Sequence, residues 1–337
     1  MVPTGVPLEL PVLSHPSAKA HHTRMDVLES NALAKIAERK AWMEDHVRGD
    51  QPWPKAEMAF GWILFAPTFP CLWTLDRGNG GEQKARDGPK WTCGLPEVEK
   101  AGRSEASRCI VHSWGSRGEV SFEKAVQALA PSCEIHIFDH SKPIRPVPRD
   151  GSARAVQYHC AWLGPQWKVD KHDLPGDPLM MTLETAMKSL GQTYVDVLKV
   201  DIEEWEWSSF AETDWHKINV GQIQVEIHPA RGKKLGDLAS LFDVLEEAGF
   251  RGMSVEPVNW HERVEQATEY VFVHRSWTPA GFAVHGLGDN STGHPHSHNG
   301  PGGHTPGHTH QGAHGTVQRR HPQPQVLGSG SSSHIDE

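Results

Sequence analysis

Two segments of the sequence carry ionisable side chains directly after apolar runs. The segment "VDVLKVDIEEWEW" leaves its apolar part at Asp201 and Glu203, and "QIQVEIHP" ends with Glu226 and His228. If the two runs are adjacent strands, these side chains meet at one sheet edge, where they are predicted to form a catalytic acid–base cluster. The alternative is a set of helix caps and ion pairs. Lys199, inside the apolar run, is predicted to pair with one of these carboxylates, because a buried unpaired ammonium is costly.

A glycine-containing turn follows another apolar segment, in "CIVHSWGSRGEVSFEKAV". Gly115 and Gly118 permit a tight turn and a close approach of the backbone to a ligand. We therefore predict a cofactor site at this turn, with Ser113 and Glu119 beside the glycines. Asp139 lies some two dozen residues beyond Gly115 and ends the next apolar segment. A carboxylate at this distance is suited to accept hydrogen bonds from both ribose hydroxyls of a nucleoside.

The glycine pattern also distinguishes between cofactors. The full G-x-G-x-x-G sequence of dinucleotide sites is absent, and that sequence holds a pyrophosphate against a helix N-terminus. A nucleoside without a pyrophosphate fits better, and the one that most often uses such a site is S-adenosylmethionine (SAM).

The elements that must position these residues begin near Arg108. Apolar strands alternate there with amphipathic helices, a pattern typical of crossover connections and a mostly parallel sheet. Ligands bind such sheets beyond the carboxyl ends of the strands, where the predicted site residues lie. The predicted strands are 109–114, 134–139, 156–163, 195–202, 222–228, 251–257 and 269–275.

The intervening helices have clear apolar stripes. One begins at Leu183 and ends at Gly191, another runs from Leu235 to Leu245, and Ser121 is predicted to cap a third. The last two strands are joined by a short connection without a helical stripe, so they are predicted to pair antiparallel. The fold class is thus an α/β, Rossmann-like sheet of seven strands, mostly parallel with an antiparallel final strand and helices on both faces.

Composition divides the chain into four parts. We predict a flexible Pro-rich N-terminus (1–25), a helix with a Trp-rich leader packed on the core (26–107), the Rossmann-like domain (108–277) and a disordered His/Gly/Pro-rich tail (278–337). The tail holds ten of the 23 histidines, so adventitious metal binding is the alternative for that segment.

Charge and cysteine usage exclude several classes. The net charge is −9 without a run of basic residues, which disfavours nucleic acid as a partner. No stretch approaches the roughly 18 apolar residues of a membrane span. The five cysteines lack C-x-x-C spacing, so neither a zinc ribbon nor a dense disulfide framework is indicated, and no metal site is predicted. We expect a soluble, cytoplasmic protein, or a secretory-pathway protein if the start of the chain is missing.

The motifs together resemble a known family. The segments "CIVHSWGSRGEVSFEKAV", "CEIHIFDHS", "TLETAMKSLGQTYVDVLKVDIEEWEW" and "QIQVEIHP", in this order, are similar to a methyltransferase-domain family that includes methyltransferase-like proteins and is kin to FkbM-type SAM-dependent methyltransferases. The upstream "CLWTLDRGNGGEQKARDGPKWTCG" resembles the leader of that family. The likeness covers about Cys71 to Arg275, and its most specific part is "DVLKVDIE" followed by "VEIH".

The resemblance implies roles for particular residues. It places the Gly115 turn against the methionine portion of SAM, Asp139 on the ribose, Asp201 with Glu203 near the transferred methyl group, and Trp162 with Leu163 beside the adenine. This chain has Glu204 and Pro89 where the family usually has glycine, and the first change implies a tighter or closed site. A disulfide between Cys71 and Cys93 is implied for an oxidising compartment, with two reduced thiols as the default expectation.

The leading hypothesis is a SAM-dependent methyltransferase that methylates an oxygen atom of a small molecule or glycan. A divalent ion bound by the same carboxylates is an alternative way to activate a hydroxyl, although the spacing does not establish it. Two other readings stay open: a catalytically inactive SAM-binding module, indicated by Glu204, and a nucleotide-dependent oxidoreductase on the same kind of sheet.

Overall fold

The computed structural model describes residues 18–47, 64–77, 90–140, 154–170, 179–230, 232–258 and 267–282. The chain divides into two units, Met1–His285 and Gly286–Glu337, and the helices and strands belong to the first. Residues 1–17 of the predicted flexible N-terminus (1–25) and residues 283–337 of the predicted tail lie outside the described residues, whereas residues 18–25 are helical. No helix in the described part of the chain is long and apolar enough to cross a membrane.

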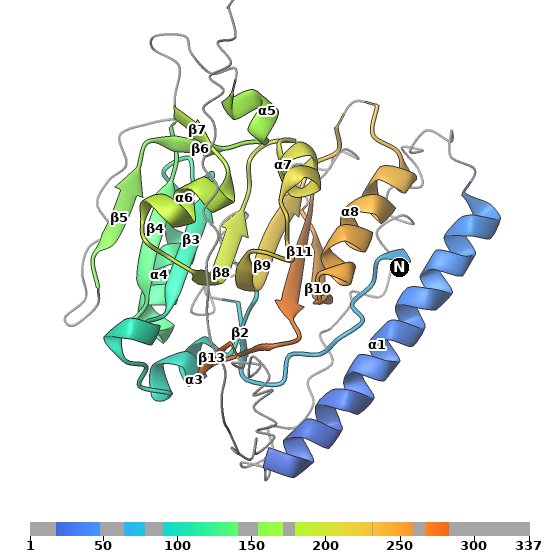
Figure 1. The fold of residues 1–337 in the computed structure, drawn as a ribbon, viewed down its shortest axis with the longest axis horizontal. Helices are drawn as coiled ribbons and strands as arrows, with labels where there is room; N and C mark the ends of the chain where they lie inside the picture. Colours follow the sequence, from blue (N-terminus) through green and yellow to red (C-terminus); the bar gives the residue numbers. More distant parts are fainter. Residues whose placement is uncertain are drawn as a thin grey trace, which may run out of the picture. The chain divides into compact units, whose positions relative to one another are not determined.

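A seven-stranded sheet forms the centre of this unit, in the order β10-β11-β9-β8-β3-β4-β5 (Figure 1). Its neighbouring strands run parallel, except that β11 is antiparallel to both β9 and β10. The predicted α/β class with an antiparallel strand at the end of the sequence is therefore confirmed. The strands are β3 (Ile110–Trp114), β4 (Glu134–Phe138), β5 (Val156–His159), β8 (Tyr194–Val200), β9 (Asn219–Ile227), β10 (Phe250–Pro257) and β11 (Thr268–His274).

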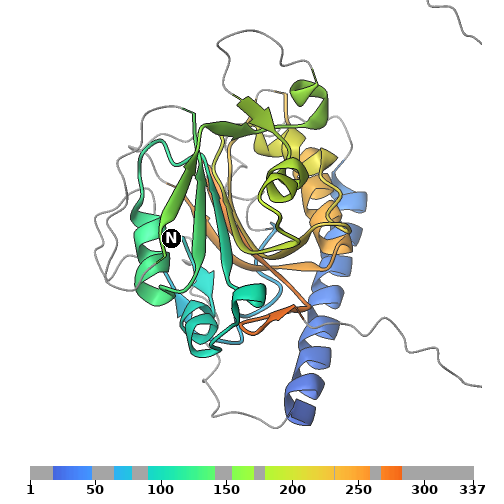
Figure 2. The ribbon, with the colours of Figure 1, turned by 60° about the vertical axis from the view of Figure 1, so that its left-hand side comes forward.

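Helices cover both faces of the sheet, as Figure 2 shows from the side. On one face, α4 packs Phe122 and Val126 against Val111 and Ile135. The other face is covered by helices whose apolar stripes meet the opposite side chains of the same strands. The helices are α1 (Ala18–His46), α3 (Leu95–Lys100), α4 (Ser121–Leu129), α5 (Gln166–Val169), α6 (Leu183–Ser189), α7 (Glu206–Glu212) and α8 (Leu235–Glu247), with a 3-10 turn at Glu105–Ser107.

The long helix α1 begins eight residues before the predicted start at Asp26. It is fixed to α8 by a buried pair of hydrogen bonds from Arg39 to Glu246, at 2.8 and 2.6 Å. The Arg39 guanidinium also lies over the rings of Phe65 and Phe242. A charged residue thus lies on the packed face of α1, which a search for apolar stripes alone does not anticipate.

The predicted strand 156–163 is wrong as a single element. It divides at Cys160 into β5 and β6 (Ala161–Leu163), and β6 pairs with β7 (Leu179–Met181) outside the main sheet. The reason is that β4 ends opposite His159, so the chain beyond this point has no neighbour in the main sheet. The new pairing satisfies the backbone of β6 and carries it over the end of the sheet.

The Trp-rich leader is hydrogen-bonded to the core through its backbone and contains a disulfide of its own. Cys93 in β2 (Thr92–Cys93), which pairs with β1 (Leu75–Asp76), exchanges hydrogen bonds of 2.9 and 2.6 Å with the Gln222 side chain of β9. Cys71 forms a disulfide with Cys93. The default expectation of reduced thiols is therefore wrong in this structure, because docking of the leader brings the two Cα atoms to 5.7 Å, within disulfide range.

A second disulfide, Cys109–Cys133, was not predicted. It joins the segments entering the adjacent parallel strands β3 and β4, whose pairing brings the two Cα atoms to 4.5 Å. A small hairpin, β12 (Trp277–Thr278) with β13 (Gly281–Phe282), follows the main sheet.

Candidate active site

The turn at Gly115 lies where the ends of β3, β4 and β8 are joined by backbone hydrogen bonds. Gly115 has φ of 77°, its N–H donates to the Phe138 carbonyl at the end of β4, and Asp201 N–H donates to the Trp114 carbonyl. A Cβ atom at Gly115 would lie 1.6 Å from the backbone oxygen of Asp201. Only glycine therefore lets the turn pass this close to the end of β8.

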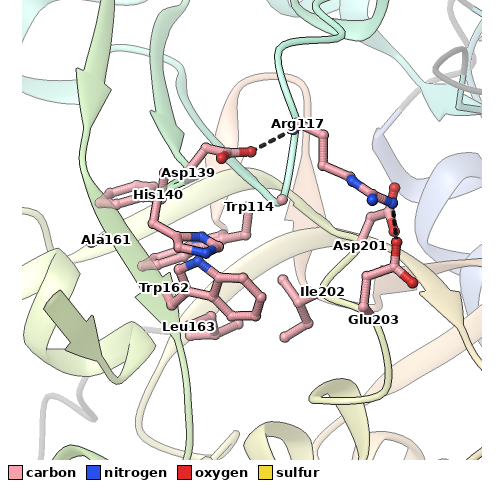
Figure 3. Close-up of a pocket in the computed structure, with 12 residues that line it drawn as sticks. Trp114, Arg117, Asp139, His140, Ala161, Trp162, Leu163, Asp201, Ile202 and Glu203 are labelled. Atoms are coloured by element: carbon pink, nitrogen blue, oxygen red, sulfur yellow. Dashed lines mark hydrogen bonds and ion pairs between the residues drawn. The ribbon is translucent and has the colours of Figure 1, made fainter. Parts of the chain in front are cut away.

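Asp139 lies at the end of β4, beside this turn. Its side chain is buried, and Oδ2 accepts hydrogen bonds from the backbone N–H of Arg117 and from the Ser116 hydroxyl, the latter at 3.3 Å. The turn after β3 thus orients the carboxylate that the sequence assigned to a ribose (Figure 3).

A cavity opens above these strand ends, with an empty volume of about 560 Å³ that includes open solvent. Six residues of the predicted site lie in its wall: Gly115, Asp139, Trp162, Leu163, Asp201 and Glu203. Sequence reasoning missed the others, which are Trp114, Arg117, Phe138, His140, Ala161 and Ile202.

Three predicted cofactor residues lie outside this wall. Ser113 is fully buried within β3, where alternation directs its side chain opposite to Trp114. Gly118 has φ of 84°, and no atom lies within 4 Å of where its Cβ would be. The Glu119 carboxylate accepts a 2.6 Å hydrogen bond from the Ser121 N–H. The predicted capping role of Ser121 is thus wrong: it is the first helical residue, and Glu119 satisfies its backbone donor.

Aromatic rings form much of the cavity wall. Trp114 stacks on Phe138 at 3.9 Å between ring centroids, and His140 meets Trp162 edge-on at 4.0 Å. The indole N–H groups of Trp114 and Trp162 are buried and find no acceptor among the described residues. Both nitrogens are closed to solvent, so the two tryptophans contribute ring surface to the cavity wall.

The predicted acid–base cluster does come together. His228 Nε2 lies 3.9 Å from Asp201 Oδ1, 3.8 Å from Glu203 Oε2 and 3.6 Å from Glu226 Oε1. Lys199 Nζ lies 3.6 Å from Asp201 Oδ2 and donates a 3.2 Å hydrogen bond to the Gly115 carbonyl, so its predicted ion pair is confirmed. The parallel pairing of β8 with β9 is the cause, since both chains leave the sheet at the same edge.

Two members of this cluster were missed. Lys90, from the leader, donates hydrogen bonds to Glu226, at 2.9 Å, and to Glu269. Burial lowers the pKa of Lys90, but the facing carboxylates of Glu269 and Glu226 outweigh it and raise that pKa above its ordinary value. The only sequence signal for Lys90 was its place in the family-like "DGPKW" segment.

Glu206, the first residue of α7, is the second missed member. It is fully buried and bonded through Oε1 to His228 Nδ1 at 2.5 Å. Burial raises the pKa of Glu206. Burial lowers the pKa of His228, but the carboxylates of Glu206, Glu226 and Asp201 outweigh it and raise that pKa to about 9. In the free site the imidazole is therefore a cation at neutral pH.

The loop after β8 has a left-handed backbone at two residues, Glu203 with φ of 55° and Glu204 with φ of 77°. Glu204 stands where the resembled family usually has glycine, and here it keeps a backbone conformation that favours glycine. Glu203 forms an ion pair with Arg117 at the cavity rim (Figure 3). The substitution therefore does not close the site.

The sheet order, with one antiparallel strand and a cavity over the parallel strand ends, defines a class I methyltransferase-like fold. A family model described as a methyltransferase domain matches residues 18–274. The chain belongs to this methyltransferase-domain family and is a SAM-dependent methyltransferase. The alternative of a nucleotide-dependent oxidoreductase is not supported.

Similar solved structures include two proteins described as methyltransferases and one pre-rRNA processing protein. A putative O-methyltransferase from Klebsiella pneumoniae is 8% identical, with a TM-score of 0.32 over 71% of this chain and 96% of that one. The magnesium protoporphyrin IX methyltransferase from Synechocystis is 13% identical, with a TM-score of 0.28 over 77% and 100%. A fibrillarin pre-rRNA processing protein from Methanococcus jannaschii is 11% identical, with a TM-score of 0.33 over 50% and 67%. No curated protein matches. At these TM-scores the structural likenesses support no conclusion of their own.

The residues of the cavity fit SAM. The cavity offers the Gly115 turn for close backbone approach, the Asp139 carboxylate for hydroxyl groups and the rings of Trp114, Phe138 and Trp162. The family uses a nucleoside cofactor, SAM, and these groups supply an acceptor and aromatic surface for it. The individual roles of the residues stay predictions.

Proposed function

We propose that this methyltransferase transfers the methyl group to an oxygen atom, a hydroxyl of a small molecule or glycan. The observation that carries the proposal is the Asp201 carboxylate. Its side chain is only 15% exposed, it lies in the cavity wall, and it accepts no hydrogen bond from any residue that the structure describes. A hydroxyl in the cavity would supply the missing donor.

The surrounding charge favours oxygen over nitrogen. Asp201 and Glu203 lie in the cavity wall, and Glu226 lies behind them beside His228. Carboxylates at this distance raise the pKa of an amine and hold it as ammonium, which has no lone pair for attack. A hydroxyl has its lone pairs in any case, and loses a proton more readily beside an acceptor.

SAM, when bound, supplies a methyl group already activated on sulfonium sulfur. The chain's own residues then mainly position: the Gly115 turn and Asp139 hold the nucleoside side of the site, and Asp201 holds the acceptor hydroxyl and receives its proton. An inactive binding module is not favoured, because Glu204 keeps the glycine-like backbone and the cavity is open.

Methyl-labelled SAM and a panel of matched alcohols and amines, including sugars, test the proposal. We expect labelled products to carry O-methyl groups. Asp139→Asn should weaken SAM binding about tenfold or more, a change of about 1.4 kcal/mol per tenfold. Asp201→Asn should retain SAM binding and lose turnover. Methyl groups found on nitrogen, or full turnover by Asp201→Asn, would refute O-methylation through Asp201.

We also propose that the protein works in an oxidising compartment. The two disulfides support this, since such bonds persist in secreted and lumenal proteins and are rare in the cytosol. Thiol alkylation of the unreduced protein from its own cells, followed by mass measurement, is the test. We expect only Cys160, the exposed free cysteine, to react. Alkylation of all five cysteines would place the protein in a reducing compartment.

A further inference from the structure

The ends of β8 and β9 bring three possible metal ligands to one point. Asp201, Glu226 and His228 each offer one atom, and these atoms lie within 4.8 Å of one another. The separations from His228 Nε2, 3.9 Å to Asp201 and 3.6 Å to Glu226, exceed hydrogen-bond length. Atoms bound to one ion at about 2.0–2.2 Å are commonly about 3–4 Å apart.

The other polar atom of each side chain faces a different partner. Lys90 binds Glu226 Oε2 at 2.9 Å, and Lys199 lies 3.6 Å from Asp201 Oδ2. Glu206 binds His228 Nδ1 at 2.5 Å. One atom of each residue is thus left facing a common point, while a second shell fixes its orientation, the arrangement found around bound metals.

The inner oxygens lack the donors that buried carboxylates need. The Glu226 side chain is 3% exposed and that of Asp201 15%, and no described residue donates a hydrogen bond to Glu226 Oε1 or Asp201 Oδ1. Direct charge-assisted hydrogen bonds between these atoms would measure about 2.7–2.9 Å. The observed gaps leave room for an ion between the three groups.

We propose that Asp201 Oδ1, Glu226 Oε1 and His228 Nε2 bind a divalent metal ion. Two carboxylates and one imidazole form a donor set suited to Mn²⁺, which accepts both ligand types. Glu203 Oε2, 3.8 Å from His228 Nε2, adds negative charge beside the three ligands. Because Asp201 also lines the cavity, the ion would reach the acceptor. Under the proposed function, on which this role rests, the ion makes the acceptor hydroxyl more acidic.

Mn²⁺ binding to the full-length, chelator-stripped protein tests the site, measured by the loss of the free-ion electron paramagnetic resonance signal. We expect one tight equivalent, weakened tenfold or more by His228→Gln and by Glu226→Gln. Mn²⁺ stands lowest in the affinity order for nitrogen ligands, so the His-rich tail competes least with this probe. Replacing His304, His308 and His310 together by alanine should leave the tight equivalent intact.

Two further variants distinguish a loss of metal binding from misfolding and from a loss of SAM binding. Glu203→Gln changes a half-exposed side chain, so it should fold even if the buried variants do not, and it should weaken Mn²⁺ several-fold. Asp139→Asn should weaken SAM binding about tenfold or more and keep Mn²⁺ affinity unchanged. Mn²⁺ bound without any O-methyl product leaves the metal site standing and refutes the proposed function. Unchanged Mn²⁺ affinity in His228→Gln and Glu203→Gln, or no tight equivalent in the native protein, overturns the metal site.

Discussion

Lys90 Nζ lies 2.9 Å from Glu226 Oε2, although 136 residues separate the two in the chain. The leader therefore supplies a buried cation to the cluster at the ends of β8 and β9. Both side chains are 3% exposed, so each depends on the other for its charge. The leader is thus a part of the site and more than a covering of the core.

Replacing this cation should be severely destabilising. Lys90→Met keeps most of the side-chain volume but leaves Glu226 and Glu269 buried without their cation, so we expect a loss of about 3–5 kcal/mol in the free energy of unfolding. Urea denaturation measures it. The matched control is Lys217→Met, which removes a surface ion pair with Asp214 and should change stability little. Equal losses in the two variants would contradict a buried role for Lys90.

The two glycines of the turn after β3 should respond differently to alanine. Both have positive φ, so each substitution carries a backbone penalty of about 1–2 kcal/mol. Only Gly115→Ala also places a methyl group against the Asp201 backbone oxygen, and it should abolish measurable SAM binding in calorimetry. Gly118→Ala should keep SAM affinity, because no atom lies within 4 Å of the new methyl. If Gly115→Ala bound SAM as tightly as the native protein, the close approach of Gly115 to Asp201 would not be needed for the cofactor site.

Glu204 should be a site where glycine stabilises the protein. Its φ of 77° is unfavourable for a residue with a Cβ atom, so Glu204→Gly should raise the free energy of unfolding by about 1 kcal/mol. The same change at Glu38, exposed in the middle of α1, should lower it by about 1 kcal/mol. Thermal unfolding of both variants, side by side, is the measurement. A loss of stability in Glu204→Gly would show that its side chain matters more than its backbone.

A buried histidine group should make the protein sensitive to acid. Burial, with the neighbouring His136, lowers the pKa of His112 from 6.5 to about 3. The unfolded chain therefore takes up this proton below about pH 6.5, while the folded protein resists it down to about pH 3. The contribution of His112 to the free energy of unfolding is therefore at its full value above pH 6.5. It falls by up to about 1.4 kcal/mol per pH unit as the pH decreases below that value.

The variant His112→Gln tests this linkage, since glutamine cannot be protonated in this range. His136 and His159, whose pKa values burial also lowers, should still contribute to the slope. Denaturation at several pH values between 7.5 and 4 should show a shallower decline for the variant than for the native chain. If the free energy of unfolding fell equally steeply with decreasing pH in both proteins, His112 would not cause the acid sensitivity.

Sequence patterns predicted most of the framework and the central cluster. Alternation and apolar runs located the strands to within a few residues, because a strand buried on both faces leaves a clear pattern in any chain. The expectation that Asp201, Glu203, Glu226 and His228 meet followed from parallel pairing alone. The break of the predicted strand at Cys160 left no such pattern, because it depends on where the neighbouring strand β4 ends. The sequence therefore did not predict it.

By itself, then, the sequence determined the order of strands and helices, the family, and the turn at Gly115, since these depend on local periodicity and on residues with few conformations. The tertiary structure alone decided that Lys90 and Glu206 join the cluster, that the leader cysteines pair, and that Ser113 and Glu119 lie outside the cavity wall. Such contacts join residues far apart in the chain or depend on which side of a strand a side chain leaves. Local sequence does not encode either, because both are settled when the leader, the sheet and α7 pack together.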